Sequence, residues 1–143
     1  MARSALKRFA PIWLPLLVLI ILPAALVGGY MVRFGYDPQE AWLAVRHFSE
    51  SGTRYGQGFE ERNFAAVRQG MRGDEVHRLL GQPMEGHLVD GKPGRVWRFS
   101  LPQPGKTWFH ERAILFDLPP GKPPVVSGVW HRFHSADLTN EVP

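Results

Sequence analysis

Six histidines are the side chains of this 143-residue sequence that best suit metal chemistry. His131 and His134 are three residues apart, a spacing that places two metal ligands on one face of a helix. The surrounding residues have the pattern of a strand, in which two such side chains point to opposite faces. The other four histidines are scattered, and there is no cysteine. We therefore predict no metal site and interpret the histidines as ordinary surface residues.

Hydrolytic chemistry needs a nucleophile, a base and a group that orients the base. None of the serines lies in a nucleophile-elbow context. The carboxylate pairs Glu60-Glu61 and Asp74-Glu75 are sequence neighbours, so their members face different directions. Asp74 and Glu75 better suit the first turn of a helix, where the helix dipole favours negative charge. The sequence thus predicts a protein that is not an enzyme, with no catalytic residue and no cofactor.

An aromatic pair offers chemistry of another kind, namely protein binding. Trp108 and Phe109 follow a Pro-Gly turn, and exposed aromatic side chains anchor many protein interfaces. Arg112 is a third candidate in the same segment. In the alternative interpretation the pair begins a strand and packs against helices. The residues do not decide between the two, so Trp108, Phe109 and Arg112 are interface candidates.

The elements that position these residues begin with an apolar segment. The 24 residues from Phe9 to Val32 carry no charge. As a helix they extend about 36 Å at 1.5 Å per residue, and the core of a bilayer is about 30 Å thick. Arg3, Lys7 and Arg8 precede the segment, and only Arg33 closely follows it. Because cationic residues stay on the cytoplasmic side, we expect a cytoplasmic N-terminus and an external domain.

A cleaved signal peptide is the alternative, since the segment also has a basic start, a short apolar core and a breaker at Pro23. The residues from Pro23 to Gly29 contain no clean small-x-small cleavage site, which favours an uncleaved anchor. Pro23, Gly28 and Gly29 are candidate contacts with a neighbouring membrane helix. Proline frees backbone carbonyls for other partners, and small residues let two helices approach closely.

The charge distribution argues against a nucleic-acid partner. The chain has a net charge of +4, with 17 Lys and Arg against 13 Asp and Glu. Without Arg3, Lys7 and Arg8, the remaining 14 basic residues face 13 acidic ones, so the external part is nearly neutral. No basic stripe is visible in it. We expect neither nucleic acid nor a small-molecule substrate as a partner.

The residues after the anchor predict helices first and strands afterwards. Helical spacing and helix-start signals predict helices over 37–50, 63–69 and 74–80. Alternation predicts strands over 85–89, 95–101, 108–117 and 125–133, with a hairpin turn at 90–94. This order is typical of an α+β domain in which short helices pack on one face of a small antiparallel sheet.

Three motifs in this region resemble the signature of the small SmpA/OmlA (BamE-like) domain: Val67-Arg68-Gln69-Gly70-Met71, Glu75-Val76 and Leu79-Leu80-Gly81-Gln82-Pro83. Val96-Trp97-Arg98-Phe99 and Ile114-Leu115-Phe116-Asp117 resemble its strands. The resemblance covers roughly residues 63–133 and implies two helices followed by a three-stranded antiparallel sheet, a unit also found in a β-lactamase inhibitory protein. The residues that carry this fold signature are Gly70, Met71, Val76, Leu80, Gly81, Pro83, Trp97 and Phe116.

The sequence departs from that family in three respects. Arg72 stands where the family usually has a Ser or Thr helix cap, so Gly73 or Asp74 must begin the helix. No cysteine is available for a lipid, unlike in the family's outer-membrane lipoproteins. The anchor and the helix over 37–50 are additions. Membership in the outer-membrane β-barrel assembly machine therefore does not follow, because a fold does not fix a function.

These observations predict four segments: a basic cytoplasmic tail and transmembrane helix (1–33), a juxtamembrane helix and linker (34–62), a BamE-like α+β domain (63–134) and a loose C-terminal tail (135–143). We expect a single-pass bacterial inner-membrane protein whose periplasmic domain binds protein, as an accessory or assembly subunit of an integral membrane protein complex. Two alternatives stay open. One is an envelope or outer-membrane biogenesis factor, and the other is a periplasmic inhibitor or small-ligand-binding module.

Overall fold

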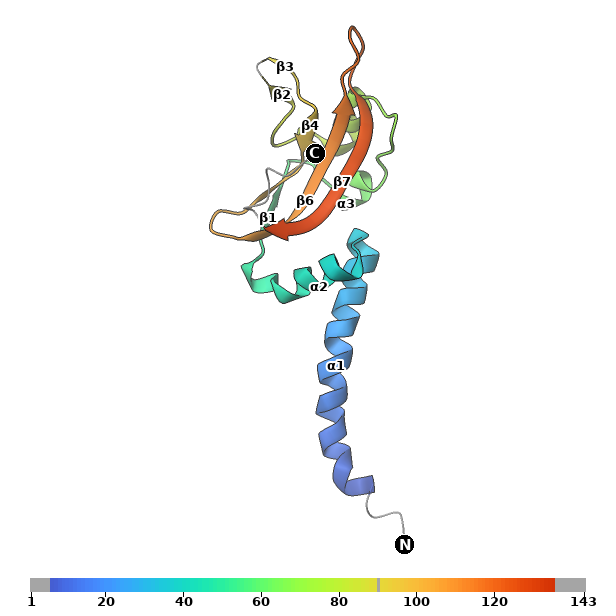
Figure 1. The fold of residues 1–143 in the computed structure, drawn as a ribbon, viewed down its shortest axis with the longest axis vertical. Coiled ribbons are helices and arrows are strands. Elements are labelled where there is room, and N and C mark those ends of the chain that lie inside the picture. The colour runs from blue at the N-terminus through green and yellow to red at the C-terminus, as the bar shows by residue number, and fades with distance from the viewer. Residues whose placement is uncertain (1–5, 90, 136–143) are drawn as a thin grey trace. The chain divides into compact units, whose positions relative to one another are not determined.

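The computed structural model describes residues 6–89 and 91–135 (Figure 1). Arg3 and nearly all of the predicted tail over 135–143 lie outside these residues. The chain divides into two compact units, Met1–Arg46 and His47–Pro143. The first unit is helical, and the second combines short helices with small antiparallel sheets, so the α+β prediction is confirmed.

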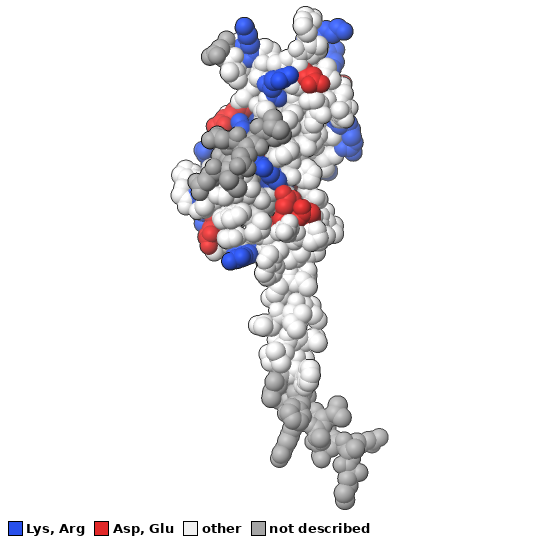
Figure 2. All heavy atoms as spheres, in the orientation of Figure 1, with Lys and Arg blue, Asp and Glu red and all other residues white. Residues whose placement is uncertain are grey.

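The first unit is built on the long helix α1, Leu6–Phe34, which runs unbroken through Pro23. Its segment Trp13–Phe34 contains an 18-residue window with a mean hydropathy of 2.3 and no buried residue, so by length and composition the helix can cross a membrane. A signal sequence would meet the same criterion. In Figure 2 the helix is uncharged over the part drawn in white before its C-terminal end, in agreement with the absence of charged residues from Trp13 to Val32. A Cβ added at Gly28 or Gly29 would meet no atom within 4 Å. Their contact with another helix stays a prediction.

Helix α2, Pro38–Arg46, follows after a turn at Gly35, whose φ is 69°. The Oδ1 atom of Asp37 accepts a hydrogen bond from the backbone N–H of Glu40 at 2.8 Å, which confirms the predicted helix start. The predicted helix over 37–50 is interrupted at His47. It continues only as the short 3-10 helix η1, Phe48–Glu50.

The centre of the second unit is a three-stranded antiparallel sheet in the order β4-β6-β7. It consists of β4 (Val96–Arg98), β6 (Trp108–Asp117) and β7 (Val125–Ser135). Strand β6 has the predicted limits, and β7 extends two residues beyond its predicted end. An irregularity in the pairing falls between Leu115 and Phe116.

Two smaller pairs flank this sheet. Strand β1 (Thr53–Tyr55) pairs with β5 (Ser100–Pro102). Strand β2 (Leu88–Val89) pairs with β3 (Lys92–Pro93), so a hairpin forms, but β2 is shorter than the predicted strand over 85–89 and β3 lies within the predicted turn over 90–94. The single strand predicted over 95–101 is wrong, because the chain changes partner at Phe99. There the N–H donates to the carbonyl of Arg112 at 2.8 Å, while the carbonyl accepts from Gly56 at 2.9 Å.

Helices α3 (Glu61–Phe64) and α4 (Gly73–Leu80) pack on one face of the central sheet. Helix α3 begins and ends earlier than the prediction of 63–69, whereas α4 starts one residue before its predicted limit. Apolar side chains of these helices, of the turn after α3 and of the sheet form one core: Phe64, Val67, Val76, Leu80, Trp97, Phe99, Ile114, Phe116 and Val126. Four of the fold-signature residues are therefore core residues.

The two ends of α4 are set by different devices. At its start Arg72 has no side-chain acceptor to offer, and its own N–H is bound instead by the Oε2 atom of Glu75 at 2.8 Å. At its end Gly81 has a φ of 78°, and a Cβ there would lie 2.6 Å from the carbonyl oxygen of Gln57. Only glycine meets both demands at this position.

Candidate binding groove

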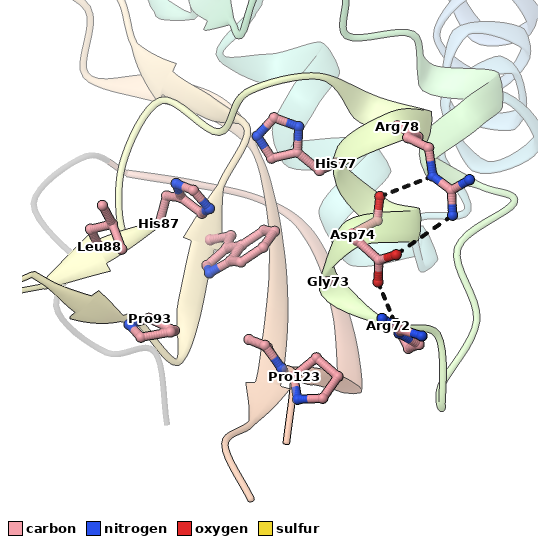
Figure 3. Close-up of a pocket in the computed structure, with 11 residues that line it drawn as sticks. Arg72, Gly73, Asp74, His77, Arg78, His87, Leu88, Pro93 and Pro123 are labelled. Atoms are coloured by element: carbon pink, nitrogen blue, oxygen red, sulfur yellow. Dashed lines mark hydrogen bonds and ion pairs between the residues drawn. The ribbon is translucent and has the colours of Figure 1, made fainter. Parts of the chain in front are cut away.

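Helix α4, the β2–β3 hairpin and the loop before β7 line an open groove with a volume of about 430 Å³ (Figure 3). Its walls are mainly apolar. The side chains that shape it include His77, His87, Leu88, Pro93, Trp97 and Pro123. The groove thus joins segments that are distant in the sequence, and no sequence motif marks it.

The indole of Trp97 is the centre of the groove and is only 3% exposed. Its Nε1 donates a hydrogen bond to the carbonyl of Gly94 at 3.1 Å, and its ring lies 4.2 Å from that of Phe116. His87 meets the indole edge-on at 4.7 Å, and His77 lies 5.5 Å from His87. His77 and His87 therefore line the groove beside Trp97. The sequence did not predict this position, because the two histidines are ten residues apart and were interpreted as scattered surface residues.

The hairpin wall of the groove is held by close backbone contacts at two glycines. A Cβ at Gly86 would collide with the carbonyl oxygen of Val96, and a Cβ at Gly94 would collide with that of Gly86. This packing fixes a wall whose strand β2 is apolar and open, because Leu88 is 60% exposed and Val89 is 56% exposed. Exposed apolar side chains beside a groove are a feature of binding surfaces.

The mouth of the groove carries charge from α4. Asp74 lies between two guanidinium groups, with its Oδ1 3.0 Å from Nε of Arg72 and its Oδ2 3.7 Å from Nη2 of Arg78 (Figure 3). All three side chains are exposed, so these pairs contribute little stability. Two cations and one anion leave a net positive charge at the mouth. Lys92 and Lys122, each next to a lining proline, are exposed as well.

Of the three interface candidates, Phe109 and Arg112 are buried, so the expectation of an exposed binding surface is wrong for these two residues. Phe109 is 1% exposed and Arg112 is fully buried, because both faces of β6 are covered, by His134 at Phe109 and by Glu61 of α3 at Arg112. Trp108 is half-buried and stacks between the rings of His47, at 4.2 Å, and Phe133, at 5.5 Å. Phe109 and Arg112 therefore cannot anchor a partner in this fold.

Arg112 instead has a structural role. Its Nε donates to Oε1 of Glu61 at 2.7 Å, and its Nη1 donates to the carbonyl of Glu111 at 2.7 Å. The guanidinium also lies 5.9 Å from the ring centre of Phe64. It thereby ties the central strand to α3. Next to it, burial and the charge of Arg112 lower the pKa of His110 to about 4, so this imidazole is neutral at pH 7.

Glu111 is the centre of a second buried cluster, on the other face of β6. Its Oε2 accepts hydrogen bonds from Nε of Arg132 at 2.9 Å and from Nε1 of Trp130 at 3.1 Å. Nε2 of His134 lies 3.0 Å from the same oxygen, and Nε of Arg98 lies 3.7 Å from Oε1. Burial alone would raise the pKa of Glu111, but the hydrogen bonds and charges of His134 and Arg132 outweigh it and lower the pKa to about 2.

Comparison with known proteins does not assign this site. No protein-family model, curated protein or solved structure matches the chain.

The groove beside Trp97 and the Glu111 cluster differ in the chemistry that their geometry allows. In the parts of the chain that the structure describes, no three His, Asp or Glu side chains lie close enough together to hold a metal ion. The Glu111 cluster is buried and places the carboxylate among Arg132, Trp130 and Arg98 of the same unit, which suits a structural role. The groove beside Trp97 is open, apolar and bordered by cations, which suits the binding of an apolar group next to negative charge.

Proposed function

We propose that this chain is a non-enzymatic, single-pass inner-membrane protein of a bacterial envelope, and that its second unit binds another protein on the periplasmic side. In this role it is an accessory or assembly subunit of a membrane protein complex. The length and hydropathy of α1 support the anchor. Arg3, Lys7 and Arg8 before the apolar segment support the orientation.

The groove beside Trp97 is the observation that carries the binding role. It is the open apolar surface next to which Leu88 and Val89 expose more than half of their area. A partner segment with an apolar side chain would cover this surface and remove it from water, which is favourable by about 25 cal/mol per Å². We therefore assign the partner site to the groove and its hairpin wall, in place of the buried residues of β6.

The proposal includes kinship with the SmpA/OmlA (BamE-like) domain. Two short helices precede a three-stranded antiparallel sheet, in the order that this family implies. Val76, Leu80, Trp97 and Phe116, which carry the resemblance in sequence, lie together in the core. Gly70 and Gly81 both have a positive φ, which explains why these two signature positions are glycine.

The experiment is a mild-detergent purification of the full chain with a C-terminal tag, read by native mass spectrometry. We expect a stoichiometric membrane protein partner with the natural chain and its loss with Leu88→Glu, which places a charge on the hairpin wall. Leu118→Glu is the matched control, because Leu118 is exposed but does not line the groove. A partner that both variants retain equally would contradict the assignment to the groove. No stoichiometric partner at all would contradict the accessory-subunit role.

A small-ligand-binding module is the second candidate, and the size of the groove favours it. Its volume of about 430 Å³ lies within the range of about 300–1,000 Å³ that is typical of small-molecule sites. The same mass spectra test this function. A bound small molecule without a protein partner, lost on Leu88→Glu but retained on Leu118→Glu, would favour it over the protein-binding role.

A further inference from the structure

Helix α2 is fixed at one end of α1. The two helices belong to the same compact unit and contact each other. The chain leaves α1 at Phe34, turns at Gly35 and enters α2 at Pro38. Where α1 crosses a bilayer, α2 is therefore held at the level of the membrane boundary.

The end of α1 has the residues that favour this boundary. The rings of Tyr30 and Phe34 are 5.5 Å apart, and Tyr36 stacks on Phe34 at the same distance. The guanidinium carbon of Arg33 lies 5.5 Å from the centre of the Phe34 ring. Tyrosine and arginine gather at the interface between hydrocarbon and water, where an apolar body and a polar tip are both satisfied.

Helix α2 itself has one buried face and one outward face. Ala41 and Ala44 are 0% and 1% exposed and mark the buried face. At about 100° per residue, Gln39, Trp42 and Arg46 project from the opposite side. Trp42 is 49% exposed. A tryptophan beside an arginine is the pair that anchors a helix among lipid headgroups, with the indole at the acyl boundary and the cation near phosphate.

We propose that α2 is an interfacial helix whose outward face, with Trp42 as the anchor and Arg46 beside it, lies against the lipid headgroups of the bilayer that α1 crosses. This inference rests on the membrane anchor in the proposed function. The occupant of the outward face is a lipid surface, because the turn at Gly35 and the contact with α1 hold α2 beside the end of the apolar helix. Contact with lipid at two places, α1 and α2, fixes the tilt of the anchor more firmly than a single helix does.

The absence of cysteine from the sequence allows a direct measurement of depth. Single variants Gln39→Cys, Leu19→Cys and Gln69→Cys of the full chain are labelled with a nitroxide and placed in nanodiscs of phosphatidylcholine and phosphatidylglycerol. Collision rates with oxygen, which enters lipid, and with a nickel chelate, which stays in water, are then compared. We expect an oxygen-to-nickel ratio at position 39 that is several-fold above that at the exposed position 69 and below that at position 19.

A second variant tests the role of the indole. Trp42→Ala should move the ratio at position 39 towards the value at position 69, whereas Trp42→Phe should shift it less. A ratio at position 39 equal to that at position 69 in the natural background would overturn the interfacial helix. A ratio at position 19 that is also aqueous would instead show that α1 does not cross the bilayer, so the two failures are distinguishable.

Discussion

Glu111 and Arg112 are consecutive residues whose fully buried side chains leave β6 on opposite faces. The carboxylate of Glu111 gathers Arg132, Trp130 and His134 on one face, while Arg112 binds Glu61 of α3 on the other. Both faces of the central strand are thus fixed by buried charge. A small domain without disulfides has a thin apolar core, and such pairs fix which elements meet as much as how strongly they meet.

Replacing Glu111 by Gln should strongly destabilise the second unit. The variant keeps the shape of the side chain but leaves Arg132 and Arg98 without their buried counter-charge, a change that costs about 3–5 kcal/mol in comparable buried pairs. The measurement is the free energy of unfolding of the full chain in detergent, from urea titration. Glu60→Gln is the matched control, because the Glu60–Arg62 pair is exposed and should change stability by less than about 1 kcal/mol. Equal effects of the two variants would refute the role of Glu111.

The carboxylate of Glu111 should make the free energy of unfolding depend on pH in the acidic range. The pKa of Glu111 is lowered from 4.5 to about 2 in the folded protein, so its contribution is complete above pH 4.5 and is lost as the pH falls from 4.5 towards 2. The slope of unfolding free energy against pH in that window should be steeper in the natural protein than in Glu111→Gln. Superimposable slopes would show that the folded carboxyl has an ordinary pKa.

Gly81→Ala should destabilise the fold more than Gly121→Ala does. Both glycines have a positive φ, 78° and 69°, so both substitutions carry a backbone penalty of about 1 kcal/mol. At Gly81 the added Cβ also lies 2.6 Å from the carbonyl oxygen of Gln57, whereas at Gly121 it meets no atom within 4 Å. Thermal unfolding of the two variants measures the difference, which should be at least 1 kcal/mol. If Gly121→Ala proved the more harmful, the close approach to Gln57 would not be a constraint.

Local patterns predicted the elements that depend on local physics. The alternation of residues 108–117 predicted β6, and the spacing of Val76 and Leu80 with Gly81 beyond them predicted α4. Contacts across the fold were not predictable in this way. Arg112 and Glu61 are 51 residues apart, and nothing near either one indicates the other. The groove likewise arises only when the hairpin folds against Trp97.

The prediction that Phe109 and Arg112 are exposed was wrong for a related reason. A sequence shows that Trp108 and Phe109 follow a turn, but the exposure of their side chains depends on what packs on the two faces of the strand they begin. Both faces of β6 are covered, because the ring of Phe109 lies 4.9 Å from that of His134 and Arg112 binds Glu61 of α3, so both side chains are buried regardless of the turn before them. The surface that is open, at Leu88 and Val89, belongs to a two-residue strand that alternation alone extends too far.

Arg72→Ser should show whether Arg72 contributes to partner binding independently of the stability of α4. Arg72 is at the N-cap with an extended backbone, φ −80° and ψ 152°, where a serine oxygen would accept a free N–H of the first turn. The free energy of unfolding should be about 0.5–1 kcal/mol higher than that of Arg72→Ala, which removes the exposed pair with Asp74 without adding a cap.

Both variants also remove a cation from the groove mouth. We therefore expect Arg72→Ser to have a higher free energy of unfolding than Arg72→Ala. Partner capture should be weakened equally in the two variants. Capture at the natural level by the stabilised variant would show that Arg72 contributes nothing to binding, and the partner would then be recognised by the apolar wall alone.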